Sequence, residues 1–227
     1  MTTSAKVILD SVSMEGRRLT TLQLRYPRFI HAEFMTHRVF SRNASSSRAI
    51  PVERLIQDVL DDPAIPCHWG KNQPGMQARE EQVDYVLLPT FYERHLPSGL
   101  YLEEAPGEFG PTAAWLEARD MAVGVARAFS DAGYHKQVAN RLLEPFAHMN
   151  VVVTASEWDN FFKLRLHEDA EPNIQLLAGA MKNALDASRP EFKHLSNQWH
   201  LPYIQREDED RPIKDLKYVS VARCARV

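Results

Sequence analysis

Hydrophobic and polar positions alternate in two segments near the start of the chain, Lys6–Asp10 and Leu19–Leu24. A period of two residues is typical of strands with one buried face. Met14–Gly16 lies between the segments and supplies a glycine-containing turn, so the pattern predicts a β-hairpin. A third strand is predicted at His148–Thr154, where three consecutive valines form a β-branched run.

Apolar residues recur at helical spacing through most of the remaining chain. Helices are therefore predicted over Arg28–Phe40, Val52–Leu60, Thr112–Ala132, His135–Leu143, Glu157–Leu166 and Asn173–Ala187. Loops are predicted over the polar Ser41–Ala49, over Cys67–Ala78 and over Glu93–Pro111, which is rich in proline and glycine. Alternation returns at Val219–Val227, so a strand-like segment is predicted there.

Together these elements predict an α+β fold of mixed helices packed on a small antiparallel or mixed sheet. The chain has 227 residues, of which 44% are hydrophobic and 25% charged, a balance typical of one globular domain. We therefore expect a single domain over residues 1–227, with an insertion at about 67–111 and an incomplete C-terminal strand at 219–227.

The charge balance narrows the function classes. A net charge of -3 and a pI of about 6.3 argue against a general nucleic-acid coat and a basic membrane binder, so neither partner is expected. The apolar runs fall far short of the ~20 residues that a membrane span needs, and Met1–Asp10 does not resemble a signal peptide. A cytoplasmic protein is expected.

The residues that commonly bind metals show no metal-site spacing. Cys67 and Cys224 form no CxxC pair, so we expect two unpaired thiols rather than a zinc site. His31, Glu33 and His37 lie close together in sequence, but their spacings do not align them on one helical face. No metal site is predicted.

The chemistry-bearing part of the sequence is an arginine-rich stretch from Arg25 to Arg48. It holds five arginines, two histidines and one carboxylate, Glu33, in a chain whose net charge is negative. Arginine forks match phosphate oxygens bidentately, and the serine hydroxyls and backbone N–H groups of the loop can add to an anion site. One hypothesis is therefore a site for a small phosphorylated ligand. The other is a surface helix whose arginines make ordinary ion pairs.

Within this stretch, Thr36–Arg48 (THRVFSRNASSSR) resembles the signature of the flavin-dependent thymidylate synthases. That signature is Arg-His-Arg, two residues, Ser, one residue, Asn-Glu, one residue, Ser, one residue, Arg. The residues that match it in register are His37, Arg38, Ser41, Asn43, Ser46 and Arg48. Two positions depart from it, because Thr36 stands in place of the first arginine and Ala44 in place of the glutamate.

Two later segments resemble the same family in the same order. Asn140–Pro145 is similar to its Ala-Arg-x-x-Leu-Pro segment, whose arginine contacts the nucleotide and corresponds to Arg141. Thr154–Arg165 resembles its Asn-Ala-Arg-x-x-x-Asn-Phe-x-x-Leu-Arg helix. The matching residues there are Asn160, Phe161, Leu164 and Arg165. The further departures are Thr154, Ser156, Glu33 (a glutamine in the family) and Asp169 (a histidine in the family).

Ala225–Val227 resembles the start of a strand that lies near the N-terminus of these enzymes. The present chain begins instead at the hairpin just upstream of the signature. The resemblance therefore implies a divergent, circularly permuted relative whose C-terminal part is absent from this sequence. A chance match of so short a segment is the alternative.

The resemblance implies conversion of dUMP to dTMP, with methylenetetrahydrofolate as carbon donor, reduced FAD as hydride source and NADPH as a further cofactor. The flavin would carry the hydride chemistry, and the protein would supply binding and orientation. A homo-oligomer is implied, expected as a tetramer, with Arg48 and Arg165 of one site drawn from different chains. Two alternatives stay open: another modification of a pyrimidine nucleotide, such as hydroxymethylation of dUMP, and a non-catalytic nucleotide-binding protein.

The resemblance also implies roles for individual residues. Arg165, at the carbonyl edge of the uracil ring, and Ser46 would be the catalytic residues. Substrate binding would fall to Glu33, Ser45, Ser46, Ser47, Arg48, Arg141 and Arg165. Cofactor binding would fall to His37, Arg38, Val39, Asn43, Asn160, Leu164 and Asp169. From the sequence alone, His37 could equally be a core histidine, Ser46 a loop cap, and Arg165 the partner of Glu168 or Asp169.

Overall fold

The fold is organised around a sheet in which the strands lie in the order β3-β6-β2-β1-β7. The computed structural model describes residues 3–75, 78–96, 99–194, 198–208 and 210–226. The strands of this sheet are β1 (Ser4–Val12), β2 (Arg18–Pro27), β3 (Ser41–Ala44), β6 (His148–Ala155) and β7 (Glu191–Phe192). β1 and β2 form the predicted hairpin, β6 runs antiparallel to β2 and to β3, and β7 runs parallel to β1. The predicted α+β class is confirmed.

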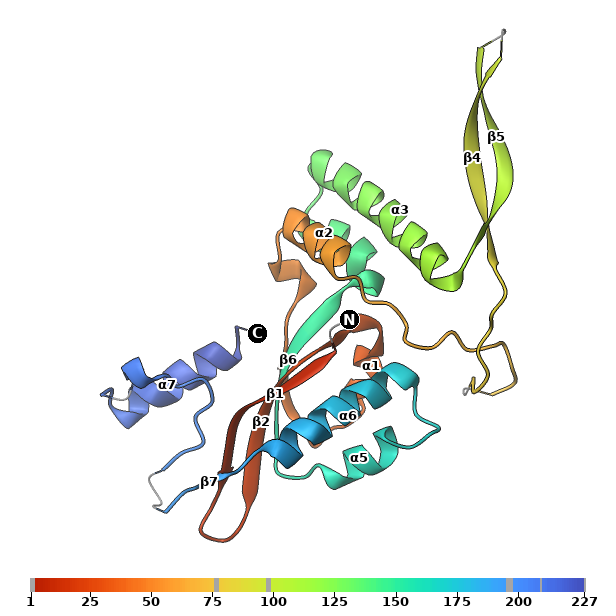
Figure 1. Cartoon of the computed structure of the whole chain (residues 1–227). Coiled ribbons are helices and arrows are strands. Elements are labelled where there is room, and N and C mark those ends of the chain that lie inside the picture. Colours follow the sequence, from red (N-terminus) through yellow and green to blue (C-terminus); the bar gives the residue numbers. More distant parts are fainter. Residues whose placement is uncertain (1–2, 76–77, 97–98, 195–197, 209, 227) are drawn as a thin grey trace.

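Helices surround the sheet (Figure 1). They are α1 (His31–Met35), α2 (Val52–Asp61), α3 (Pro111–Asp131), α4 (Lys136–Ala139), α5 (Asp159–Arg165), α6 (Pro172–Ala187) and α7 (Ile213–Cys224), with short 3-10 helices at Arg28–Ile30, Ser47–Ala49, Asn140–Phe146 and Arg206–Asp208. The helices predicted at α2, α3, α5 and α6 are confirmed. Gly133 follows α3 with a φ of 82°, a conformation that favours glycine at a helix end.

One face of the sheet carries the main hydrophobic core. Leu22 and Leu24 of β2 are register partners of Val153 and Val151 of β6, and all four side chains are fully buried. They point the same way because side chains alternate between the two faces of a strand. Residues of α1, α5 and α6 pack against them. This core fixes α1 and α5 beside one another.

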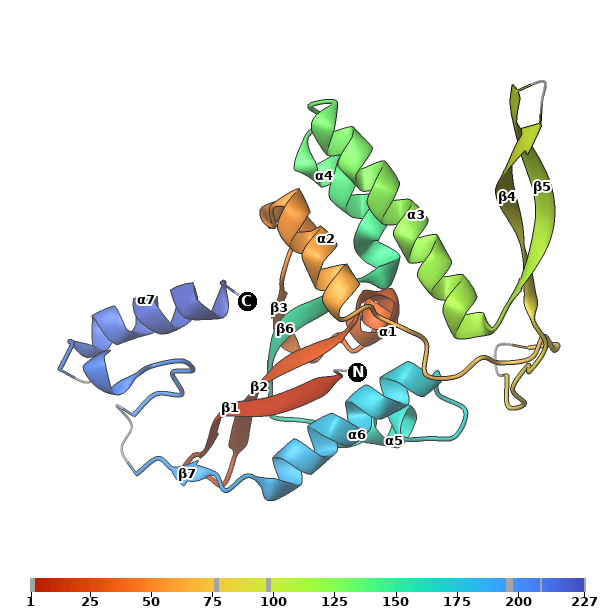
Figure 2. The same ribbon diagram turned by 45° about the horizontal axis from the view of Figure 1, so that its top comes forward.

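A second hydrophobic core joins α2, α3 and the 3-10 helix Asn140–Phe146. Its buried members include Leu55 and Val59 of α2, Val123 of α3, and Leu143. Figure 2 shows α2 and α3 at one end of the sheet, beyond the loop that follows β3. This packing holds the 3-10 helix next to that loop.

A long hairpin stands away from both cores (Figure 1). It consists of β4 (Val86–Leu96) and β5 (Gly99–Phe109), which pair antiparallel as a separate two-stranded sheet. The loop predicted over Glu93–Pro111 is therefore wrong. Pro89 and Pro106 are register partners in this hairpin. Both strands are edge strands, and an edge strand tolerates the missing N–H of proline, so these residues do not prevent pairing.

Two predictions around the signature were also wrong. Ser41–Ala44, predicted as part of a loop, forms β3, because its backbone completes the edge of β6 despite a polar sequence. The helix predicted over Arg28–Phe40 ends at Met35. Beyond it, Arg42 donates hydrogen bonds to the backbone carbonyls of Met35 and His37, so a side chain satisfies groups that a longer helix would have paired.

The helix predicted over His135–Leu143 is split in the structure. α4 ends at Ala139, and the chain continues as a 3-10 helix through Pro145 to Phe146. The expected stop before the proline is therefore wrong. Leu143 and Phe146 are buried in the second core, and this packing carries the helical path past the proline.

The strand predicted at 219–227 is contradicted, because α7 occupies Ile213–Cys224. Val221 is 68% exposed, whereas Ser220 is buried, so the alternation of this segment does not mark a buried strand face. Val227 lies outside the described residues. Figure 2 shows α6 and α7 on different sides of the sheet.

Among the described residues, no helix combines the length and the apolar character needed to cross a membrane.

Candidate functional site

Arg165, at the end of α5, reaches across to α1 and to the turn that follows it. Its Nε donates a hydrogen bond to Nε2 of His37 at 2.9 Å, and its Nη2 donates to Oγ1 of Thr36 at 3.2 Å. Its Nη1 lies 3.9 Å from a carboxylate oxygen of Glu33. The structure therefore brings together three predicted site residues, Glu33, His37 and Arg165, and adds Thr36 to them.

Aromatic packing sets this geometry. The Phe161 ring of α5 is buried, and its centroid lies 4.8 Å from that of the His37 imidazole and 6.0 Å from that of Phe34. Phe40 lies 5.3 Å from the same ring. Phe161 and Arg165 are four residues apart on one helix, so the buried ring anchors the face from which the guanidinium extends.

The electrostatics of the cluster shift the pKa values of His37 and Glu33. Burial lowers the pKa of His37, and the charges of Arg165 and Arg42 lower it further. Because Nε2 accepts a hydrogen bond, the proton of this neutral imidazole lies on Nδ1. The pKa of Glu33 is raised by burial and by the nearby Glu171 carboxylate, and Arg165 opposes that shift.

Arg165 keeps donors for a ligand. A guanidinium has five N–H groups, and the contacts with His37 and Thr36 use two of them. The Arg165 side chain is 22% exposed and lines a pocket of about 440 Å³ together with Leu164 and Asp169. Charge-assisted donors in the wall of a pocket suit a carbonyl or carboxylate oxygen.

Four predicted cofactor-binding residues lie on the surface around this cluster. Arg38 and Val39 are in the turn after His37, and Val39 is 73% exposed. Asn160 and Leu164 are exposed on α5, four residues apart and therefore on one face of that helix. The surface thus offers exposed apolar side chains together with amide and guanidinium donors.

The serine loop after β3 forms a second group of predicted residues. Ser45 is tied to β6, because its Oγ accepts from the Asn150 backbone N–H and its own N–H donates to the Asn150 carbonyl. Ser47 is buried and donates to Oε1 of Glu144 at 2.6 Å. Ser46 is exposed between them, and its side chain does not cap the 3-10 helix that follows. Its hydroxyl is therefore available to a ligand.

Two exposed arginines accompany this loop. Arg48 and Arg141 belong to two 3-10 helices that are joined by a hydrogen bond from Asn140 Nδ2 to the Ser47 carbonyl at 2.7 Å. Within the part of the chain that the structure describes, neither guanidinium makes a hydrogen bond or an ion pair. A pocket of about 330 Å³ adjoins the loop, and its lining includes Ser45, Ser46, Arg25, Arg54 and His148.

Asn43 faces elsewhere. It pairs in register with Val152, and its Nδ2 donates to the carbonyl of Cys224 at 3.1 Å, at the end of α7. It lines a groove of about 640 Å³ between the sheet and α7. Its predicted role therefore depends on α7 as well as on the signature.

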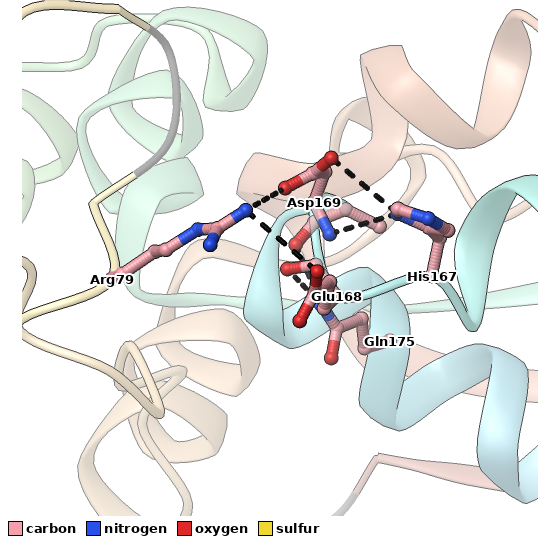
Figure 3. A network of polar contacts seen from close by, with 6 residues as sticks. Arg79, His167, Glu168, Asp169 and Gln175 are labelled. Carbon is pink, nitrogen blue, oxygen red and sulfur yellow. Dashed lines mark hydrogen bonds and ion pairs between the residues drawn. The ribbon is translucent and has the colours of Figure 1, made fainter.

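Asp169, a predicted cofactor-binding residue, is held by Arg79 and not by Arg165, the partner that the alternative interpretation gave it (Figure 3). Arg79 Nη2 lies 2.8 Å from Oδ1 of Asp169 and 3.7 Å from Oε1 of Glu168. His167 Nδ1 lies 3.6 Å from Oδ2 of Asp169. Gln175 Nε2 donates to the backbone carbonyls of Glu168 and Ala170, which fastens this loop to the first turns of α6. The alternative that Arg165 serves these two carboxylates is thus not what the structure shows.

The two groups of predicted residues lie at opposite ends of β3. The turn containing His37 precedes the strand, and the Ser45–Arg48 loop follows it. At about 3.3 Å per residue, the four residues of β3 span roughly 13 Å. A single chain therefore does not bring Arg48 into contact with the Arg165 cluster.

The sequence interpretation missed Arg42 and Glu144. Arg42 stands at a position that the signature leaves open, yet it fixes the turn carrying His37 through two backbone carbonyls. Glu144 accepts from Ser47 and lies 3.1 Å from Arg28. Glu144 acts through contacts with residues far away in sequence, and Arg42 acts on backbone carbonyls left free where α1 ends earlier than predicted, so neither role has a local sequence signal.

The predicted thiols and metal-binding residue types can also be located. Cys67 and Cys224 are both free, partly buried thiols. Over residues 3–75, 78–96, 99–194, 198–208 and 210–226, the structure contains no group of three or more His, Cys, Asp or Glu side chains placed to hold a metal ion.

Comparison with known proteins shows which family model the sequence matches and which solved structure has a similar fold. A family model described as thymidylate synthase complementing protein (Thy1) matches residues 18–191. Among solved structures, the UMP/dUMP methylase PolB from Streptomyces cacaoi, bound with 5-Br dUMP, is similar with a TM-score of 0.54. The two chains are 13% identical, and the match covers 81% of this chain and 90% of that chain, so it establishes likeness of fold. The comparison with curated proteins gives no match.

Proposed function

The chain belongs to the thymidylate synthase complementing protein family, and from this premise we propose that it converts dUMP to dTMP as a flavin-dependent enzyme. Methylenetetrahydrofolate is the proposed carbon donor, reduced FAD the hydride source and NADPH the reductant of the flavin. The observation that carries the proposal is the hydrogen-bonded pair of Arg165 and His37, two residues that match the family pattern and meet from distant elements.

The nucleotide phosphate is assigned to the loop after β3. Arg48 and Arg141 are exposed, and their guanidinium groups are unpaired within the described structure. A phosphate can accept two parallel hydrogen bonds from a guanidinium, so two free arginines beside the Ser46 hydroxyl suit it. Ser45 and Ser47 hold this loop in shape through Asn150 and Glu144.

The uracil ring is assigned to the Arg165 cluster. Negative charge develops on a uracil carbonyl oxygen when the ring acts as a nucleophile at C5. A preorganised guanidinium at that oxygen stabilises the charge, and Arg165 is held in place by His37, Thr36 and Glu33. Catalysis then rests on orientation and electrostatics rather than on attack by a cysteine.

The residues around the cluster fit a flavin. Val39 and Leu164 are exposed apolar groups that can cover a planar ring, and Arg38 and Asn160 supply charged and amide donors beside them. A bound flavin supplies hydride transfer, and the protein orients it against the nucleotide. His37, neutral and protonated on Nδ1, keeps Arg165 on the nucleotide side.

We assign the complete site to more than one copy of the chain. The phosphate group and the Arg165 cluster are separated by β3, so a copy that contributes Arg48 to one site contributes Arg165 to another. A homotetramer is the proposed assembly.

A second candidate, a non-catalytic nucleotide-binding protein, is favoured by one observation. Two of the predicted cofactor residues are occupied within the chain itself, Asn43 by the Cys224 carbonyl and Asp169 by Arg79. Loss of flavin binding with retention of the phosphate site would fit that arrangement.

The deciding experiment titrates the purified chain with FAD and with dUMP, followed by flavin fluorescence and calorimetry. The proposal expects both to bind and dUMP to perturb the flavin spectrum. Product mass then separates methylation from hydroxymethylation of the uracil ring. Binding of dUMP without FAD contradicts the proposal in favour of the second candidate.

A further inference from the structure

A chain of buried hydroxyl and imidazole groups lies on the face of the sheet opposite the main core. Ser11 Oγ is 2.7 Å from Nδ1 of His200, and Thr21 Oγ1 is 2.8 Å from Nε2 of the same ring. Thr21 Oγ1 also lies 2.6 Å from Oγ1 of Thr154. Ser11 is 4% exposed and Thr21 fully buried, so the contacts are shielded from water. The function proposed above assigns no role to these groups.

These contacts join distant parts of the chain. Ser11 belongs to β1 and Thr21 to β2, the two strands of the hairpin, whereas His200 lies in the segment after β7. Both ring nitrogens are engaged, so the imidazole is fixed in position and orientation by two strands at once. A hydroxyl can either donate or accept, and a neutral imidazole has one nitrogen of each kind, which satisfies both contacts.

Described residues that follow His200 are joined by further contacts to β2 and to α7. Tyr203 donates from its hydroxyl to Oε1 of Gln23 on β2 at 3.2 Å. Arg223 of α7 donates to the Tyr203 carbonyl at 2.7 Å and forms an ion pair with the buried Asp208. Ser220 donates to the carbonyl of Pro202 at 2.8 Å. A constraint at His200 is therefore transmitted to the helix through buried and partly buried polar contacts.

The far end of this unit meets the signature. The carbonyl of Cys224 accepts the hydrogen bond from Asn43 Nδ2, and both residues line the groove of about 640 Å³. His200, Ser220 and Lys217 line the same groove. The position of α7 therefore sets the orientation of the Asn43 amide.

We propose that His200 is a positioning residue, which fastens the segment between β7 and α7 to the β1–β2 hairpin and thereby holds α7 where the Cys224 carbonyl fixes the Asn43 amide at the groove. This inference rests on the proposed function, because Asn43 has a cofactor role only if the chain binds the flavin that its family resemblance implies. His200 touches neither nucleotide nor cofactor in this assignment. It acts through α7 and through Asn43.

The test compares Thr21→Val with Thr21→Ser, supported by His200→Ala. Valine has the shape of threonine but lacks its hydroxyl, whereas serine keeps the hydroxyl. The pair therefore distinguishes loss of the hydrogen bond to His200 from a change in packing. The first readout is the maleimide labelling rate of Cys224 at the end of α7. Cys67 lies elsewhere in the fold and serves as the internal control for global unfolding.

The second readout is the dissociation constant of FAD, set against that of dUMP. We expect Thr21→Val and His200→Ala to speed Cys224 labelling and to weaken FAD binding by up to ~10-fold, the effect of losing one hydrogen bond from the displaced Asn43 amide to the cofactor. Cys67 labelling and dUMP affinity should change less than about twofold, which a general loss of structure would not allow. Thr21→Ser should behave as the wild type.

Three results would overturn the inference. An unchanged Cys224 labelling rate in Thr21→Val would show that the Thr21–His200 contact does not hold α7 in place. Faster Cys224 labelling with unchanged FAD affinity would show that the position of α7 does not affect FAD binding. A wild-type chain that binds no FAD removes the proposed function and the inference with it, and this outcome is distinguishable because it appears before any substitution is made.

Discussion

Arg165 and His37 share a hydrogen bond of 2.9 Å in which Arg165 Nε is the donor and His37 Nε2 the acceptor. The contact ties α5 to the signature turn, and it requires an imidazole that is neutral and protonated on Nδ1. The permanent charge of the guanidinium therefore opposes protonation of the ring, together with burial of the ring.

Replacing Arg165 by methionine should raise the pKa of His37. The substitution removes a positive charge from the imidazole, and the effect of burial remains, so the pKa should rise without exceeding its ordinary value of 6.5. Histidine titration by NMR measures it. Lys163→Met, an exposed neighbour on α5, is the matched control and should leave His37 unchanged. A lower His37 pKa in the Arg165 variant would contradict the geometry.

Arg48→Ala should weaken dUMP binding by ~10-fold or more, because a charge-assisted contact with the phosphate is lost. The stability of the chain should hardly change, since Arg48 is exposed and unpaired within the described residues. Calorimetric titration gives the affinity. Arg17→Ala, an exposed arginine in the β1–β2 turn, should bind dUMP as the wild type does. Equal affinities for the two variants would remove Arg48 from the site.

The chain should lose stability as the pH falls from about 6.5 toward 4. Burial lowers the pKa of both His148 and His200 from 6.5 to about 4, with smaller contributions from nearby charges. The unfolded chain therefore binds protons at a higher pH than the folded chain does. The stabilisation is fully present above pH 6.5 and is lost toward the folded pKa values.

Thermal melts across this pH range would show the loss as a fall in Tm of the order of 10 °C or more. His148→Gln should flatten the pH dependence, whereas the same change at His135, which is exposed, should not. A Tm that stays constant or rises as the pH is lowered from 6.5 to 4 would count against the burial of both imidazole rings.

Arg18→Met should destabilise the fold by about 2 kcal/mol, because it leaves a buried carboxylate without its cation. The Asp10 side chain is 2% exposed, and Arg18 Nη2 lies 2.6 Å from its Oδ2. Thr20 also donates to Asp10, which limits the loss. Chemical denaturation gives the free energy of unfolding. Lys182→Met breaks an exposed pair with Asp186 and should cost under about 0.5 kcal/mol, so a similar cost for both variants would contradict the burial of Asp10.

The elements predicted correctly are those whose local pattern agrees with their burial. β2 alternates because one face packs on the main core, β6 carries a run of three valines that are all buried, and α2 presents Leu55 and Val59 to the second core. The wrong predictions concern segments whose secondary structure is set by contacts with other elements and not by their own sequence pattern. β3 has a polar sequence and is a strand because β6 offers an open edge, and α7 has strand-like alternation but forms a helix.

The same distinction holds at the candidate site. His37, Glu33 and Arg165 could be named from the sequence because the signature and the α5 segment carry them at fixed spacings. The partner of Asp169 could not be named. Arg79 lies 90 residues earlier, in a loop whose path depends on the folded body and not on its own composition.

The β4–β5 hairpin is an arm whose length can change without changing the rest of the fold, because it forms a separate two-stranded sheet. Val86 and Phe109 are register partners, so the chain enters and leaves the hairpin at neighbouring positions. The gap that the backbone must close at the base is the same whether few residues or many lie beyond it, and added length costs little loop-closure entropy. Shortening or grafting this arm is therefore an operation on the surface of the molecule, one that a protein engineer could perform without redesigning the sheet or the cores.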